Sequence, residues 1–341
     1  MKVLSFVIPA YNSEAYLDKC IPSMLVPEVL SKLEIIVVND GSKDATSEIA
    51  RKYCQQYPDV VRLISQENKG HGGALNTGCA AAQGKYLKVI DADDWILSEN
   101  LPTFLSLLEN CSSDVVLTHH HTIDISTGEI KNWKSYPKEF GKGYTFSEIM
   151  SDWRSFDRSL TFHGITYRTA FYQKFGHPLL EHAFYEDHEY ATYPCCYAER
   201  VTPFDLFLYE YRIGDVNQSV SNANQLKRLG HTEAVLQRMA EEYQRIPESG
   251  GKQYAAMKIQ GLLLSYLTTA LLVSTDKKAG RRLAQAQMAQ RQADTPDAWT
   301  LAKPKYQVFR LLNRLHVNKA GWDAILSSRL YNRLRGNHDF T

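Results

Sequence analysis

Short apolar runs that each end in a polar cluster recur along the first 120 residues of the chain. The runs cover residues 3–8, 34–38 and 86–90. The clusters that follow them are Pro9-Ala10-Tyr11-Asn12, Asn39-Asp40-Gly41-Ser42 and Asp91-Ala92-Asp93-Asp94. Segments with helical spacing separate the runs, and a continuous apolar run is typical of a strand that is buried on both faces. The alternation predicts an α/β fold built on a parallel, doubly wound sheet.

The polar clusters predict a ligand site, because an open α/β sheet binds its ligands beyond the carboxyl ends of its strands. Adjacent carboxylates repel one another, so the acidic cluster at residues 91–94 indicates a cation. Carboxylates together with substrate phosphate oxygens suit Mg²⁺ or Mn²⁺. A solvated strand end with helix-capping acids would give the same residues, and an Asp-x-Asp pattern alone has little specificity.

A glycine-rich segment over residues 70–73 precedes a helix that we predict over residues 74–82. Helix N-termini attract phosphate, so the segment predicts a phosphate contact, although its glycines would serve tight helix–sheet packing equally well. The segment lacks the GxxxxGK[ST] pattern of a P-loop, and no GxGxxG follows the first strand. A nicotinamide-binding Rossmann site is therefore disfavoured.

Four motifs in order, VIPAYN, VVNDGSxD, NxGxxxAxNxG and DADD, resemble the nucleotide-sugar domain of family-two glycosyltransferases with the GT-A fold. The resemblance covers residues 3–125 closely and continues more loosely to about residue 221. It implies a Rossmann-like mixed sheet with helices on both faces. It also implies an inverting, non-processive transferase that moves a hexose-type sugar from a nucleotide-sugar, with a UDP-sugar favoured, to an acceptor hydroxyl.

The resemblance assigns roles to particular residues. Tyr11 would stack on the nucleotide base, and Asp40 would accept a hydrogen bond from that base. Asp93 would be the principal metal ligand, with Asp91 beside it near the ribose or the metal. The donor-binding residues that it implies are Pro9, Tyr11, Asn12, Asp40, Lys69, Gly70, Asn76, Asp91, Ala92 and Asp93.

Residues 184–190 read FYEDHEY and resemble the family's "ED" segment, in which a carboxylate acts as the catalytic base. An acceptor hydroxyl is a poor nucleophile until its proton is removed during the attack. A metal ion would neutralise the leaving diphosphate, and one base with one metal suffices for a single, inverting displacement. Asp187 is the predicted base and Glu186 the alternative, whereas a solvated helix start would also explain the acidic run.

The sequence departs from the family's pattern at Leu75, where many members carry arginine. Any phosphate or sugar contact of that arginine would have to come from elsewhere, such as Lys69 or His71. Farther along, Arg212 and residues 218–221 resemble the closing YR…SxS segment. Arg212 would either offset phosphate charge or pair with a structural carboxylate.

Three consecutive histidines, His119 to His121, follow the predicted fifth strand over residues 114–118. Side chains alternate along a strand, so His119 and His121 should share one face. Such a pair could bind zinc, but contact with the acceptor or simple packing is favoured. His163 is a similar candidate for an acceptor contact.

Composition excludes several classes of protein. The chain has 39 Lys and Arg against 38 Asp and Glu, so it has no bulk electrostatic reason to bind nucleic acid. Its six cysteines form no CxxC pair, which indicates reduced thiols and a reducing compartment. The apolar stretch over residues 261–273 is shorter than the roughly 20 residues of a membrane span. We therefore expect a cytoplasmic protein without a transmembrane segment.

A change to helix-forming residues after residue 221 predicts a domain boundary. We expect a catalytic domain over 1–221, with a nucleotide-sugar half at 1–125 and an acceptor half at 126–221. Residues 222–341 should form a mainly helical module. Its apolar helix over 261–273 would be covered by a partner helix or subunit, so we expect a homo-oligomer.

The C-terminal segment over residues 303–335 carries eight basic residues and one acidic residue. Apolar residues run alongside them, so the segment predicts a basic amphipathic surface in peripheral contact with anionic lipid. A lipid-linked acceptor would reside there, although a glycan or a glycoprotein acceptor is equally compatible with the sequence. The favoured alternative is a helix pair that packs on its own domain with a solvated basic face.

Two other functions compete with glycosyl transfer. Sugar-phosphate nucleotidyltransferases share a similar fold but have a Gly- and Arg-rich signature after the first strand, where this chain has Pro9-Ala10-Tyr11-Asn12. A non-catalytic nucleotide-sugar-binding scaffold would tolerate loss of the acidic cluster or of the ED pair, and both are present. A processive membrane synthase is disfavoured because no QxxRW motif is found.

Overall fold

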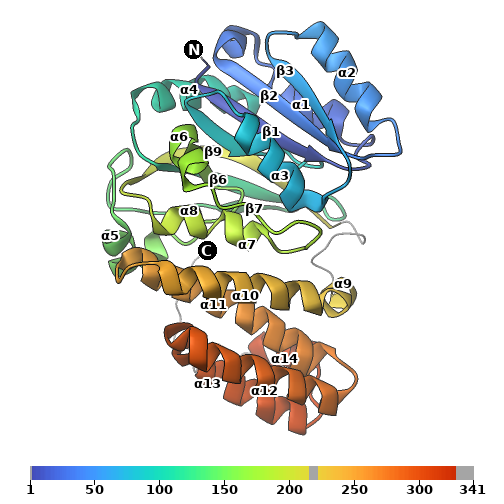
Figure 1. The fold of residues 1–341 in the computed structure, drawn as a ribbon, viewed down its shortest axis with the longest axis vertical. Coiled ribbons are helices and arrows are strands. Elements are labelled where there is room, and N and C mark those ends of the chain that lie inside the picture. The colour runs from blue at the N-terminus through green and yellow to red at the C-terminus, as the bar shows by residue number, and fades with distance from the viewer. Residues whose placement is uncertain (1, 215–221, 328–341) are drawn as a thin grey trace. The chain divides into compact units, whose positions relative to one another are not determined.

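The structure, a computed structural model, describes residues 2–214 and 222–327 (Figure 1). It contains two compact units. Unit 1 comprises residues 1–218 and 246–254, and unit 2 comprises residues 219–245 and 255–341. The stretch 246–254 thus belongs to the sheet-containing unit, whereas its composition had placed it in the helical module.

Within the described residues, the strands of unit 1 form one nine-stranded sheet in the order β3-β2-β1-β4-β8-β6-β9-β5, with β7 paired to β6. Their bounds are β1 Leu4–Ala10, β2 Leu33–Asp40, β3 Val61–Gln66, β4 Tyr86–Val89, β5 Trp95–Ile96, β6 Val115–Asp124, β7 Ile130–Trp133, β8 Ile165–Arg168 and β9 Val201–Ile213. Strands β1 to β4 pair in parallel, and β8 is antiparallel to both β4 and β6. The mixed sheet is confirmed, and the purely parallel sheet predicted from the alternation is wrong beyond β4 because β8 is inserted there.

Helices cover both faces of this sheet. They are α1 Leu17–Met24, α2 Thr46–Gln56, α3 Gly70–Ala81, α4 Leu101–Asn110, α5 Phe146–Ser151, α6 Thr169–Phe175, α7 Asp187–Tyr190 and α8 Tyr193–Cys196, with 3₁₀ turns η1 Pro27–Lys32, η2 Ser98–Asn100 and η3 Trp153–Ser155. Leu17 of α1 lies in one core cluster with Phe6 and Ile8 of β1. On the other face, a Cβ added to Gly78 of α3 would lie 2.3 Å from Val7 Cγ1. Alternate residues of β1 therefore pack against helices on opposite faces of the sheet.

Helix α3 begins at Gly70, so the glycine-rich segment forms its first turn instead of preceding it. The predicted helix start at residue 74 was wrong. Glycine disfavours a helix interior, but here it allows the backbone of another segment to approach the helix. A Cβ added to Gly72 would lie 2.3 Å from Leu180 O.

Unit 2 is helical, as predicted. Its helices are α9 Asn222–Lys227, α10 Leu229–Arg245, α11 Gly250–Thr268, α12 Lys277–Asp294, α13 Pro296–Arg314 and α14 Lys319–Leu326, with a π-helical turn η4 Thr269–Val273 and the start of α11 assigned to unit 1. The buried Arg291 of α12 donates hydrogen bonds to Leu236 O of α10 and to the Asp294 carboxylate. Among the described residues, the helical stretch Gly250–Val273 is long and apolar enough to cross a bilayer, but 56% of its most apolar window is buried, as in the core helix of a globular protein.

Candidate functional site

The loops after β1 and β2 are tied together by Asn12. Its backbone N–H donates to Ser42 Oγ at 3.0 Å, and its side-chain oxygen accepts from the Lys43 N–H at 2.9 Å. Asn12 has a φ of 50°, a left-handed conformation that asparagine tolerates better than most residues. The neighbouring Tyr11 is 50% exposed, whereas Pro9 is buried within β1. The Tyr11 ring is therefore exposed to solvent next to a loop that the hydrogen bonds of Asn12 hold in place.

Asp40, at the end of β2, is 2% exposed, and its carboxylate is held in one orientation. Its Oδ1 accepts hydrogen bonds from the Lys69 N–H at 2.8 Å and from Gln66 Nε2 at 2.7 Å. Asn68 Nδ2 donates to the Asp40 carbonyl oxygen at 3.0 Å. No residue within the described ranges donates a hydrogen bond to Asp40 Oδ2, so this oxygen can accept one from a ligand.

Helix α3 is clamped to residues 179–186, the segment that leads to the ED pair. The Asn76 amide donates to Leu179 O at 3.0 Å, and its oxygen accepts from the Leu179 N–H at 2.8 Å. Gly70 adopts a φ of +77°, and a Cβ there would crowd the backbone of the same segment. Asn76, predicted to bind the donor, is thus engaged in holding this segment. The Lys69 ammonium, which is half exposed, lies 3.7 Å from Glu181.

One imidazole joins the acidic cluster to the ED pair. His71 Nδ1 lies 2.5 Å from Glu186 Oε1, and His71 Nε2 lies 2.9 Å from Asp91 Oδ1. Burial lowers the pKa of His71, but the hydrogen bonds to Asp91 and Glu186 raise it by more, so the pKa lies well above its usual value. The ring is therefore an imidazolium that donates both N–H groups. The sequence had suggested His71 only as a substitute phosphate contact.

The acidic cluster contains a buried member, Asp94, that is not among the predicted site residues. Asp94 is 1% exposed and accepts hydrogen bonds from the Tyr209 hydroxyl at 2.6 Å and from the Arg212 N–H at 2.8 Å. Burial, followed by the charges of Asp91 and Asp93, raises the pKa of Asp94 well above its usual value. In the sequence, Asp94 is marked only by its place in a run of acids. Nothing in the sequence indicates that Tyr209 and Arg212 are its hydrogen-bond partners.

Asp93 is the more accessible of the two predicted metal ligands. Burial and the Asp91 charge raise the pKa of Asp93, while Arg212 Nη1 lies 3.5 Å from its Oδ2. Arg212 therefore pairs with an acid of the cluster, and its guanidinium also lies over the Tyr16 ring at 4.8 Å. The remainder of the predicted closing segment, residues 218–221, lies outside the described residues.

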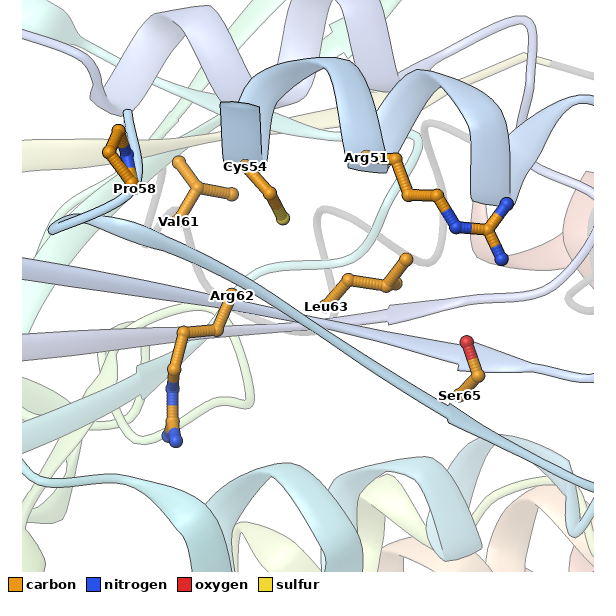
Figure 2. A pocket seen from close by; sticks show the side chains of 7 residues that line it. All are labelled: Arg51, Cys54, Pro58, Val61, Arg62, Leu63 and Ser65. Carbon is orange, nitrogen blue, oxygen red and sulfur yellow. The ribbon is translucent and has the colours of Figure 1, made fainter. Parts of the chain in front are cut away.

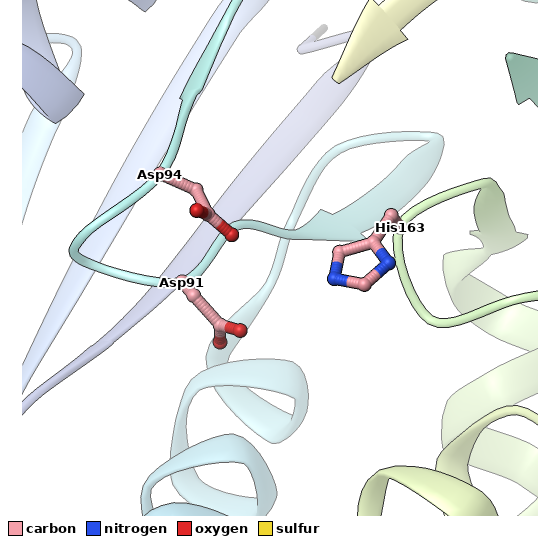
Figure 3. Close-up of side chains that lie close together, drawn as sticks. All are labelled: Asp91, Asp94 and His163. Atoms are coloured by element: carbon pink, nitrogen blue, oxygen red, sulfur yellow. The ribbon is translucent and has the colours of Figure 1, made fainter. Parts of the chain in front are cut away.

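The donor atoms available here suit a divalent cation. Asp91, Asp94 and His163 each offer a ligand atom, and these atoms lie within 4.8 Å of one another (Figure 3). Burial lowers the pKa of His163 well below its usual value, which keeps the ring in the neutral form that binds metals. Two carboxylates with one imidazole fit Mn²⁺, and the oxygens fit Mg²⁺. Asp94 and His163 therefore join the predicted Asp91 and Asp93 as candidate ligands, and the intervening Ala92 is buried.

The two members of the ED pair lie in different environments. Glu186 is 3% exposed and is engaged with His71. Asp187, the first residue of α7, is half-buried, and its carboxylate accepts no hydrogen bond from any residue that the structure describes. Tyr185 precedes the pair with a φ of 74°, a strained conformation of the kind found at functional sites. Asp187 is therefore the carboxylate that remains available to a ligand.

The histidines of β6 divide between two faces of the strand. His119 and His121 both contact the Phe207 ring, with centroids at 5.1 and 4.3 Å, and so share one face. His119 is buried between Ser159 and Asp205, and burial lowers its pKa to about 4. His121 lies 2.6 Å from the Glu210 carboxylate. These contacts favour the packing interpretation for both histidines.

The residue between them, His120, packs against other aromatic rings, those of Trp133 and His163. The His120 ring lies 5.1 Å from the His163 ring, which in turn stacks on Tyr211 at 4.0 Å. Lys88 in β4 is fully buried, and its ammonium group donates to the carbonyl oxygens of His163 and Ile165 at 2.7 and 3.1 Å. Lys88 therefore holds the turn that carries His163. A single lysine in an apolar run gave no sign of this contact.

A shallow hollow elsewhere in unit 1 belongs to different elements. Figure 2 shows it between α2 and the edge strand β3. Its lining residues are Arg51, Cys54, Pro58, Val61, Arg62, Leu63 and Ser65. None of them belongs to the predicted site. All six cysteines of the chain are free thiols, as expected.

Comparison with known proteins agrees with this arrangement of motifs. Residues 5–174 match the family model described as "Glycosyl transferase family 2". Glycosyltransferase GlyA of Streptococcus pneumoniae serotype 4 is 33% identical over 125 residues, which are 37% of this chain and 18% of that protein. Uncharacterized glycosyltransferase YibD of Escherichia coli K12 is 37% identical over 136 residues, which are 40% and 38% of the two chains. The matches thus span less than half the length of these relatives.

The solved structure of S. aureus TarS 1–349 in complex with UDP-GlcNAc superimposes with a TM-score of 0.66 at 19% identity, and the match covers 93% of both chains. At that identity the likeness concerns the fold alone. The fold and the ordered motifs define a GT-A protein of the nucleotide-sugar transferase class. The chain belongs to the family-two glycosyltransferases.

Proposed function

We propose that this chain is a non-processive inverting glycosyltransferase that transfers a hexose-type sugar from a nucleotide-sugar to an acceptor hydroxyl. The observation that carries the proposal is the position of the His71 ring, whose two nitrogens contact Asp91 and Glu186. It links the acidic cluster, which would hold the donor diphosphate through a metal, to the pair that would activate the acceptor. Both groups would then act on one reacting carbon in a displacement reaction.

The first two motifs would hold the nucleotide. The half-exposed Tyr11 ring offers a surface for base stacking, and Asp40 Oδ2 can accept a hydrogen bond from a base N–H. Uracil offers such an N–H and so does guanine, so a UDP-sugar is the favoured donor by family resemblance alone. Because both contacts are remote from the reacting carbon, they would bind substrate and transition state equally.

Asp91 and Asp93 would hold Mg²⁺ or Mn²⁺, with Asp94 and His163 completing the ligand set. When bound, the metal would neutralise the charge that develops on the leaving nucleoside diphosphate. The protein's own contribution is to keep the carboxylates oriented. The Tyr209 hydroxyl and the Arg212 N–H fix Asp94, and His71 fixes Asp91.

Asp187 would take the proton from the acceptor hydroxyl as that oxygen attacks the anomeric carbon. Glu186 is less suited to this role because its carboxylate is buried and bound to His71. A single attack opposite the leaving group inverts the anomeric centre. The acceptor would be a glycan, a glycoprotein or a lipid-linked glycan, and we retain a cytoplasmic location and a homo-oligomer as part of the proposal.

A donor panel tests the proposal. The full chain is incubated with Mn²⁺ and individual nucleotide-sugars, first without and then with candidate acceptors. A transferase releases nucleoside diphosphate and yields a product with inverted anomeric configuration, which NMR can establish. In a parallel incubation with a nucleoside triphosphate and a sugar 1-phosphate, release of pyrophosphate would identify a nucleotidyltransferase instead. Binding of nucleotide-sugar without turnover in either incubation would identify a scaffold.

A further inference from the structure

Helix α13 is one of the helices of unit 2 (Figure 1). It exposes a stripe of apolar side chains. The exposed side chains on the helix are Leu301 at 49%, Val308 at 44% and Leu311 at 57%, and Leu315, which follows the last helical residue, is exposed to 64%. At 100° per residue, these four fall within about 80° of the helix circumference. Among the described residues of unit 2, the other exposed large apolar side chains are Leu226 and Leu283.

This stripe is distinct from the face that packs inside unit 2. Ala302, Phe309 and Leu312 are buried, and the Phe309 ring contacts Trp322 of α14 at 5.7 Å. The buried residues lie beside the stripe on the helix circumference. Helix α13 therefore has more apolar surface than its own unit covers, over about four turns.

Basic residues border the stripe on its other side. Lys303, Arg310 and Arg314 are exposed and fall together on the circumference, next to Leu311. No acidic residue occurs between positions 298 and 322. The long side chains of lysine and arginine can lie along apolar surface while their charges reach a polar phase.

Charge is distributed unevenly along the chain. Residues 303–335 hold eight of the 39 basic residues and one of the 38 acidic residues, which leaves 31 basic and 37 acidic residues elsewhere. The basic residues Arg329, Arg333 and Arg335 of this segment lie outside the described residues. A segment of net positive charge on a chain that is otherwise net negative orients that segment toward an anionic surface.

We propose that the exposed face of α13 binds the surface of an anionic lipid bilayer. The stripe would enter the boundary between headgroups and acyl chains, and Lys303, Arg310 and Arg314 would lie at the level of the lipid phosphates. A second copy of this chain fits the face poorly, because two such faces would bring like charges together.

Vesicle flotation of the full chain tests the proposal. We expect binding to vesicles of phosphatidylcholine and phosphatidylglycerol at 3:1, binding at least about tenfold weaker to phosphatidylcholine alone, and weaker binding at high salt. The double variants Leu311→Ser/Leu315→Ser and Arg310→Gln/Arg314→Gln should each reduce binding about tenfold or more. Matched changes on α12, Leu283→Ser and Lys278→Gln/Arg282→Gln, should leave binding unchanged.

Three results would overturn the proposal. The wild-type chain could fail to float with anionic vesicles. The α12 variants could lose as much vesicle binding as the α13 variants, which would show that binding does not depend on the face of α13. Light scattering could instead show self-association that the α13 variants abolish, which would make a second copy the occupant. Transfer to a soluble acceptor should be unaffected throughout, so a failure here is distinguishable from failure of the proposed function.

Discussion

At the scale of single residues, the candidate site depends on which carboxylates are engaged and which remain available. Glu186 and Asp187 are adjacent in the sequence, yet one is bound to the His71 imidazolium and the other accepts no hydrogen bond within the described chain. A general base needs an available lone pair directed at the acceptor. We therefore predict that Asp187 acts as the base and that Glu186 acts as a positioning residue.

We predict that Asp187→Asn leaves donor binding intact and reduces transfer by roughly a hundredfold or more, the usual scale for a general base. The loss should appear in kcat with little change in the donor's apparent affinity. Steady-state kinetics at saturating donor and acceptor measure it. Glu186→Gln is the control and should be milder. A dead Glu186→Gln together with an active Asp187→Asn would reverse the two roles.

Replacing His71 by leucine should destabilise unit 1 by about 2 kcal/mol or more, because it leaves the buried Glu186 carboxylate without its charged partner. The double variant His71→Leu/Glu186→Gln should be more stable than the sum of the two single effects predicts, since neither charge remains. Urea unfolding of all four proteins gives the coupling free energy. If the two single effects on the free energy of unfolding add up to that of the double variant, the contact between His71 and Glu186 contributes nothing to stability.

Burial lowers the pKa of Lys88 to about 7, far below the ordinary lysine value of 10.5. Between these values the unfolded chain binds a proton that the folded chain does not, so the free energy of unfolding should rise with pH from about 7 upward. The slope would be at most about 1.4 kcal/mol per pH unit. Lys88→Met should remove this slope in urea melts at pH 7, 8 and 9, whereas the exposed Lys52→Met should retain it.

At the scale of elements, glycines decide how closely the site's segments approach. Helix α3 forms through four glycine and histidine positions that have little helix propensity. Contacts with residues 179–186 outweigh that propensity, as shown by the Asn76 amide, which engages both backbone groups of Leu179. The ED pair is therefore held against the acidic cluster by α3.

Gly72→Ala should disrupt this contact. The added Cβ would lie 2.3 Å from Leu180 O and 2.9 Å from Glu186 Cγ, so the segment must move. We expect a loss of about 1–3 kcal/mol in stability and of roughly a hundredfold in transfer. Gly261→Ala in α11 is a matched control with no atom within 4 Å of the new Cβ, and it should stabilise the protein by about 0.4–1 kcal/mol. Equal effects at the two positions would contradict the assigned contact.

At the scale of the whole molecule, the sheet-containing unit is completed by a segment from beyond the predicted domain boundary. Tyr254 donates a hydrogen bond to Ala191 O at 2.7 Å, and its ring contacts Phe146 and Trp153. A fragment that ends at residue 221 would lack these contacts. The unit that carries the candidate site is therefore discontinuous in sequence.

We predict that Tyr254→Ala destabilises unit 1 by about 3–5 kcal/mol, the usual cost of removing a large buried aromatic side chain. Amide hydrogen exchange should become faster over residues 146–156 and 191–196, where its contacts lie. Tyr266→Ala is the control, because Tyr266 is buried in unit 2 and donates to Glu233. Protection that is unchanged in unit 1 would contradict the discontinuous assignment.

The sequence by itself determined the parallel half of the sheet, the polar strand ends and the helical character of unit 2, because each follows from local periodicity. The tertiary structure alone decided the insertion of β8, the start of α3 at Gly70 and the return of residues 246–254 to unit 1. It also decided that His71 joins Asp91 to Glu186 and that Lys88 holds the turn of His163. These features depend on contacts between residues up to 115 positions apart, and such contacts leave no local pattern in the sequence.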